Sequence, residues 1–150
     1  MLRFEKSVII NCSLRELFEF HTDVDNLIHL SKFRGMRVKL LKATLPIAKG
    51  SELLLKVTGF GIYRTKWHLR VTSFNQPDSF TDEIIKGPFK TWKHTHKFED
   101  TGTACKMTDI IEYEMPFGFL GDIFRKLFFK RMLNDLFDFR HKLTKKLLEK

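Results

Sequence analysis

The chain has 150 residues, a length that suits one domain, and its 27 Lys and Arg residues against 18 Asp and Glu residues give a formal net charge of +9. Hydrophobic residues make up 43% and charged residues 30%, which excludes a disordered chain, and two cysteines exclude a disulfide scaffold and favour a reducing, cytoplasmic location. Glu5 and Lys6 interrupt the N-terminal apolar stretch, and no apolar window approaches the ~18 residues of a membrane span, so we expect neither a signal peptide nor a membrane helix.

The first elements along the chain are a strand and two short helices. Residues 2–10 alternate between the two sides of the chain, which predicts a strand. Ser13 and Glu16 have the spacing of a capping box, in which a hydroxyl and a carboxylate satisfy the free amides of a helix start. A second cap at residues 22–25 predicts another short helix, which contains the apolar residues of segment 24–30.

From about Met36 to Tyr113 the hydrophobic period is two, as in strands. The pattern predicts six strands, at residues 36–41, 52–59, 62–74, 80–86, 91–98 and 103–113. Short turns rich in Gly, Pro, Asn and Asp separate them and leave no room for a crossover helix. Consecutive strands are therefore expected to pair antiparallel.

A long helix is predicted from about Phe119 to Leu148, about 45 Å in length. Its apolar residues fall on two faces, one over 120–127 and another over 128–147. Only this helix is long enough to cover the apolar face of the sheet. The predicted fold class is α+β, a curved antiparallel sheet of about seven strands wrapped around a long C-terminal helix, with two short helices after the first strand.

This order of elements, together with one sequence motif, resembles the START/Bet v 1-like superfamily, also called SRPBCC or polyketide cyclase/dehydrase and lipid transport. The segment GPFKTWKHTHKF at residues 87–98 is similar to the motif GPF-x-x-W-x-H-x-H-x-F of a bacterial subgroup. The subgroup continues with a D-x-x-x-Y strand, a P-x-G turn and a Phe-x-x-Arg helix end, here Asp109 to Tyr113, Pro116 with Gly118, and Phe137 with Arg140.

The resemblance implies a helix-grip fold over residues 1–150 as one ligand-binding domain. The wider superfamily binds lipids, sterols, polyketides and hormones in a cavity, and some members are cyclases or hydrolases. The fold by itself does not choose among these functions. The 16 Phe residues of this chain are consistent with an apolar interior that can hold such a ligand.

The strand of the motif carries a row of ring side chains on one face. Trp92, His94, His96 and Phe98 alternate with Lys and Thr residues, and the Lys face must contact water. The ring face is therefore expected to point inward, toward the cavity. Two imidazoles there can bind a ligand carboxylate or hydroxyl, or act as acid and base; structural hydrogen bonds to neighbouring strands are the alternative.

Asp109 lies in an apolar strand, on the inward side, where a carboxylate needs a partner. His94, His96 or Arg140 can supply it. Asp109 and the two histidines are thus the catalytic candidates, and a buried structural pair between sheet and helix is the alternative interpretation of Asp109.

An H-x-H pair on a strand can also bind a metal ion. The third ligand would have to come from Asp109, Asp82, Glu83 or His68 on other strands. No such ligand lies close in the sequence, so neither a metal nor a cofactor is predicted.

Three functions follow from these patterns. The first is binding of a small apolar or amphipathic molecule (a lipid, polyketide or isoprenoid-like compound) between sheet and helix. The second is a cofactor-independent enzyme of cyclase or dehydrase type, and the third is a protein-partner module that uses the Phe-rich helix. The predicted ligand contacts are Trp67, Trp92, His94, His96, Phe98, Asp109, Tyr113, Phe124, Phe128 and Arg140.

The positive charge is concentrated at the C-terminus. Residues 125–150 hold nine Lys and Arg against three Asp and Glu. Such a helix can contact an anionic membrane transiently, with a solvated helix face or a dimer interface as the alternatives. No RNA-binding aromatic motif is present, so nucleic acid is not an expected partner, and the chain can be a monomer or a homodimer.

Overall fold

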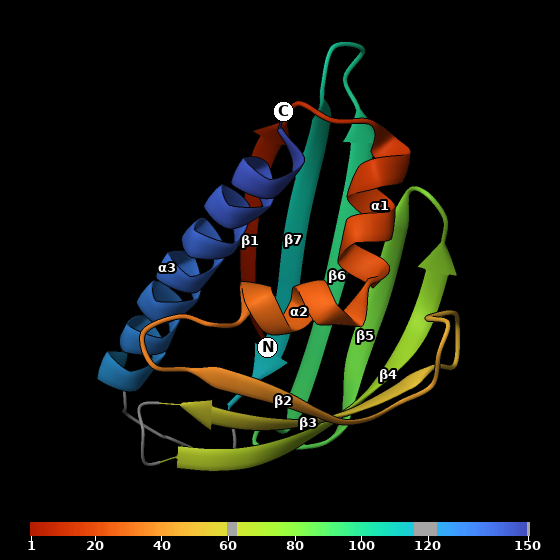
Figure 1. Ribbon diagram of the computed structural model, residues 1–150. Coiled ribbons are helices and arrows are strands. Elements are labelled where there is room, and N and C mark those ends of the chain that lie inside the picture. The colour runs from red at the N-terminus through yellow and green to blue at the C-terminus, as the bar shows by residue number, and fades with distance from the viewer. Residues whose placement is uncertain (60–62, 116–122, 150) are drawn as a thin grey trace.

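The computed structural model describes residues 1–59, 63–115 and 123–149 (Figure 1). Every predicted element is present within these residues, whereas the predicted first turn of the long helix and the P-x-G turn lie outside them. The elements are β1 (Leu2–Ile10), α1 (Leu14–Thr22), α2 (Val24–Leu30), β2 (Arg37–Ala43), β3 (Glu52–Gly59), β4 (Tyr63–Asn75), β5 (Ser79–Lys86), β6 (Thr91–Asp100), β7 (Cys105–Glu114) and α3 (Ile123–Leu148).

All seven strands form one antiparallel sheet in the order β1-β7-β6-β5-β4-β3-β2. The three helices lie on its concave side, with α1 over β6, α3 beside β1, and α2 between α3 and β2 (Figure 1). Register shifts interrupt the β2–β3 pairing once and the β4–β5 pairing twice. Such irregularities bend strands, and these lie in the part of the sheet that curls under the helices.

The two short helices begin where the sequence predicts caps. The hydroxyl of Ser13 accepts the N–H of Glu16 at 3.1 Å and opens α1, and the carboxylate of Asp23 accepts the N–H of Asp25 at 2.9 Å and opens α2. Because Asp23 is both the last cap of α1 and the first cap of α2, the two helices meet at a sharp corner. None of the described helices has the length and apolar character that crossing a membrane requires.

Helix α3 is attached to the sheet by apolar and polar contacts. Leu133 and Phe137 are buried against Phe4 of β1, and the rings of Phe4 and Phe137 lie 5.5 Å apart. The ammonium of Lys6 donates to the side-chain oxygen of Asn134 at 3.0 Å. These contacts hold α3 over β1 and β7, so that its opposite edge faces the space above β3 and β4.

Candidate functional site

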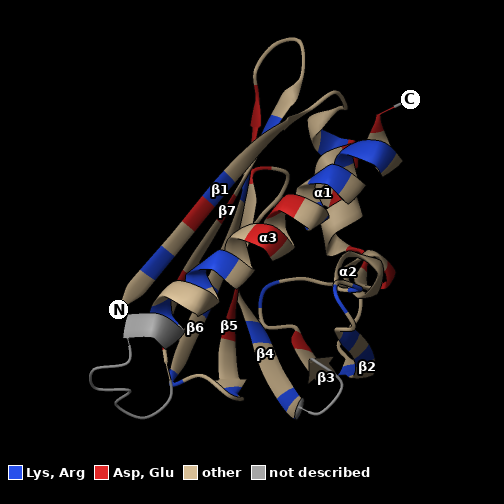
Figure 2. Cartoon of the chain, turned by 90° about the vertical axis from the view of Figure 1, so that its left-hand side faces the viewer, with Lys and Arg blue, Asp and Glu red and all other residues tan. Residues whose placement is uncertain are grey.

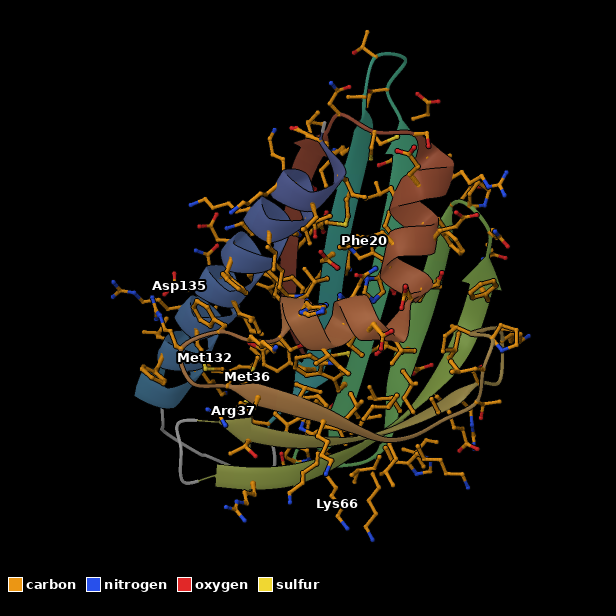
Figure 3. All side chains as sticks on the ribbon, in the orientation of Figure 1. Phe20, Met36, Arg37, Lys66, Met132 and Asp135 are labelled. Atoms are coloured by element: carbon orange, nitrogen blue, oxygen red, sulfur yellow. The ribbon has the colours of Figure 1, made fainter. Side chains whose placement is uncertain are left out.

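A cavity of about 210 Å³ lies between the curled strands, α2 and α3. Its walls are apolar, formed by Leu53 and Leu55 of β3, Leu69 of β4 and the inner face of α3. Met36, before β2, and Met132, on α3, both line it and lie close together at the gap between β2 and α3 (Figure 3). Flexible thioether side chains at such a gap can move aside to admit a ligand.

Five of the residues predicted from the sequence line this cavity. They are Trp67, Trp92, His94, His96 and Arg140. The indole rings of Trp67 and Trp92 meet edge to face with centroids 5.1 Å apart, on the inward face that strand alternation predicts. The lysines that alternate with them, including Lys66 in Figure 3, point away from the interior.

Four other predicted ligand contacts do not line the cavity. Phe98 is packed beneath α1, Tyr113 is buried between β7 and α3, and Asp109 lies behind the two histidines. Phe128 is 65% exposed. The inward face of α3 carries Phe129, Leu133 and Phe137, which are spaced four residues apart, and Phe128 points about 100° away from Phe129 around the helix axis. The side chain of Phe124 lies outside the described residues.

The polar end of the site is built around the carboxylate of Asp109. Its Oδ1 accepts from Nε2 of His94 at 2.7 Å and lies 3.3 Å from Nδ1 of His96, and its Oδ2 accepts from Nε2 of His141 at 2.6 Å. On its other side, His96 donates from Nε2 to Oδ2 of Asp82 at 3.3 Å. Asp109 therefore has partners on both its own sheet and α3, as its position in an apolar strand requires.

Sequence reasoning missed two histidines of this cluster. His141 is buried on α3, four residues after Phe137 on the same helix face, and this spacing is the signal that could have found it. His21 lines the cavity from α1, four residues after Leu17, and its ring lies 6.1 Å from that of His96.

Burial and charge set the ionisation of the cluster. Burial favours a neutral Asp109, but hydrogen bonds from His141, His94 and His96 outweigh it and hold its pKa well below the ordinary value. Burial likewise opposes a charged His96, but its hydrogen bonds with Asp109 and Asp82 raise its pKa. For His94, burial and the neighbouring His96 lower the pKa, so this imidazole is the neutral base of the pair.

Arg140 brings a positive charge to the same cavity. Its guanidinium carbon lies 5.0 Å from the ring centroid of Phe137. Burial lowers its pKa, and the charges of Asp109 and Asp82 oppose that effect. Within residues 1–59, 63–115 and 123–149, no carboxylate forms an ion pair with this guanidinium at 4.0 Å or less, so it is available to an anionic group of a ligand.

The sequence profile described as polyketide cyclase/dehydrase and lipid transport matches residues 10–139. The chain belongs to this family. The search of curated proteins gave no match.

Solved structures of low sequence identity share its fold. Protein CV1439 from Chromobacterium violaceum has a TM-score of 0.78 at 9% identity and covers 100% of this chain and 99% of its own. A START superfamily protein from Mycobacterium smegmatis has a TM-score of 0.71 at 14% identity, with 97% and 98% covered. Ginseng major latex-like protein 151 from Panax ginseng has a TM-score of 0.71 at 12% identity, with 99% and 98% covered. The helix-grip fold expected from the sequence is thus confirmed.

Proposed function

We propose that this protein binds a small amphipathic molecule, with its apolar body against Leu53, Leu55 and Leu69 and its polar end at Arg140 and His96. The observation that carries the proposal is one cavity with apolar walls and a charged cluster at one end. Family members of the polyketide cyclase/dehydrase and lipid transport type make an apolar ligand a consistent choice. A lipid, polyketide or isoprenoid-like acid has this combination of parts.

The size of the cavity limits the ligand. Its volume of about 210 Å³ is below the ~300–1,000 Å³ of typical ligand pockets. A compact molecule therefore fits directly, and a longer chain requires Met36 and Met132 to change rotamers and extend the space toward the gap between β2 and α3.

Binding of the fluorescent probe anilinonaphthalene sulfonate, which joins an apolar body to an anion, tests this proposal. We expect Leu55→Trp, which fills the cavity, to weaken probe binding by roughly tenfold or more, the equivalent of about 1.4 kcal/mol. Leu41→Trp, on the exposed side of β2, is the matched control and should leave binding unchanged. Equal affinity in the two variants would place the probe elsewhere and contradict the proposal.

A second candidate function is proton transfer on a bound carbonyl compound. It is favoured by His94, a neutral base that lines the cavity and is oriented by the carboxylate of Asp109. Deuterium uptake from D₂O into a β-diketone probe, followed by NMR, tests it. If the wild type takes up deuterium faster than the probe does in buffer alone, and His94→Gln loses this acceleration, the result supports catalysis. If the wild type shows only the buffer rate, the result contradicts catalysis and supports binding alone.

A further inference from the structure

Three side chains on the cavity wall bring metal-binding atoms together from two neighbouring strands. Asp82 of β5 and His94 of β6 are direct partners in the antiparallel pair, and His96 follows on the same face of β6. One nitrogen of each histidine and one carboxylate oxygen of Asp82 all lie within 4.8 Å of one another. From the sequence we predict no metal, because no third ligand lies near the H-x-H pair along the chain. In the structure, the pairing of β5 with β6 brings Asp82 beside that pair.

The carboxylate of Asp109 orients both imidazoles from behind. Because Nε2 of His94 donates to Oδ1 of Asp109, its Nδ1 keeps the lone pair that a metal ion needs. Nδ1 of His96 lies 3.3 Å from the same oxygen, which leaves Nε2 of His96 directed at Asp82, 3.3 Å from its Oδ2. A second hydrogen bond to Asp109, from Nε2 of His141 on α3 at 2.6 Å, fixes the carboxylate itself. A carboxylate behind a metal-binding imidazole is a recurrent feature of metal sites.

We propose that Asp82, His94 and His96 bind a divalent transition-metal ion, of the Zn²⁺ or Fe²⁺ type, with Asp109 as a positioning residue. Two imidazoles and one carboxylate suit these ions, and all three ligands line the cavity, so a further coordination position faces the bound molecule. Tetrahedral bonds of about 2.0–2.1 Å place donor atoms about 3.4 Å apart. Nε2 of His96 and Oδ2 of Asp82 already lie 3.3 Å apart, and because all three donor atoms lie within 4.8 Å of one another, no pair has to approach by more than about 1.4 Å.

The charges around the site are consistent with a cation. Metal binding requires neutral imidazoles, and the remaining charged groups that face the site are then Asp82, Asp109 and Arg140. Two carboxylates against one guanidinium leave one negative charge in a buried place, and a divalent ion changes this to one positive charge. An anionic fourth ligand, either hydroxide or the acid group of a bound molecule, would neutralise it. The metal site does not depend on the proposed amphipathic ligand, because three of its ligands are protein side chains and hydroxide can be the fourth.

Titration of the chelator-treated protein with Co²⁺, followed by calorimetry and by visible ligand-field absorption, tests the site. We expect one ion per chain, with the intense absorption of a four- or five-coordinate ion. Asp82→Asn and His96→Gln should each weaken binding at least 100-fold, and Asp109→Asn should weaken it roughly 10- to 100-fold, as for carboxylates behind metal ligands elsewhere. Zn²⁺ should compete for the same site and raise the thermal midpoint of the wild type but not of Asp82→Asn.

His68→Gln is the matched control. His68 lies on the opposite face of β4, with Nε2 3.0 Å from Glu52, so its loss should leave Co²⁺ affinity within twofold. Absence of stoichiometric binding at millimolar Co²⁺, or unchanged affinity in a folded Asp82→Asn, would overturn the proposal. The side chain of Asp82 is 15% exposed, against 5% for Asp109 and 8% for His94, so Asp82→Asn is the variant best able to fold, and it decides the question even if a substitution at His94 or Asp109 prevents folding.

Discussion

The concave face of the sheet is filled at one end and hollow at the other. Under α1, Phe18 meets Phe74, Phe80 and Phe98 with ring centroids 5.3–5.8 Å apart, all edge to face. Beneath α2 and the edge of α3, the leucines of β3 and β4 line open space instead. Both ends are apolar, so composition does not distinguish them. The difference comes from the covering elements: α1 packs directly on β6, whereas α3 is held over β1 and only the short α2 lies over β3 and β4.

The polar cluster lies at the boundary of these two regions. The ring of His96 stacks on Phe80 with centroids 4.1 Å apart and an interplanar angle of 15°, and the same ring lines the cavity. Asp109 fixes this boundary because it joins β6 and β7 to α3. From this comparison we predict that truncation of apolar side chains lowers stability most at the filled end, and that substitution of polar side chains lowers it most at the boundary.

Truncation of Phe18 should have the largest effect on stability. Phe18→Ala removes a ring from a filled core and should lower the free energy of unfolding by about 3–5 kcal/mol. Leu55→Ala, at the hollow end, should cost about 2 kcal/mol, because part of its surroundings is already empty. Urea unfolding of both variants measures the difference, and equal losses would contradict the distinction between the two ends.

Removal of the charge at Asp109 should have the next largest effect. Asp109→Asn leaves three imidazoles around a neutral amide and should cost about 2–3 kcal/mol at neutral pH. Because the folded pKa of Asp109 is depressed, this contribution is present above its ordinary value of 3.8 and is lost as the pH falls below it. The variant and the wild type should therefore converge in stability in acid. Asp82→Asn should cost less throughout, because the side chain of Asp82 is 15% exposed and accepts one longer hydrogen bond, from His96 at 3.3 Å.

Much of this architecture could be predicted from the sequence, since alternation and turns define the strands and two caps define α1 and α2. Alternation also identifies which face of β6 is inward. Alternation does not say which part of a strand a helix covers. It therefore could not predict that Phe98 lies under α1 while Trp92, on the same face of β6, lines the cavity. His21 and His141 come from helices distant in sequence, and only the packing of those helices brings them to β6.

Acid should destabilise the protein through His21. Burial, followed by the charge of His96, lowers the pKa of His21 from 6.5 to about 3. The unfolded chain then binds more protons, so stability is full above pH 6.5 and declines as the pH falls toward 3. Between pH 7 and pH 5, the wild type should lose about 2 kcal/mol more than His21→Gln. If the wild type and His21→Gln lose the same stability over this pH range, the acid sensitivity comes from other groups. His68→Gln is the control and should lose as much stability as the wild type.

The smallest effect is expected at the surface of α3. Figure 2 shows two groups of basic residues on this helix, separated by acidic ones. In the sequence, Lys126, Lys130 and Arg131 flank Leu127 and Phe128, whose side chains are 61% and 65% exposed. We propose that this end contacts anionic membranes. Phe128→Ser should weaken co-sedimentation with phosphatidylserine vesicles roughly three- to tenfold at low salt. Ile85→Ser, on β5, is the control, and absence of binding to anionic vesicles in the wild type would remove the proposal.

Native mass spectrometry of the freshly purified protein tests the central claim, ligand binding in the hollow end, most directly. A co-purified molecule should appear as one stoichiometric mass increment on the wild type and on Leu41→Trp, and it should be absent from Leu55→Trp, in which the cavity is filled. A wild-type protein that carries the bare chain mass and that takes up no added fatty or polyketide acid would contradict the account.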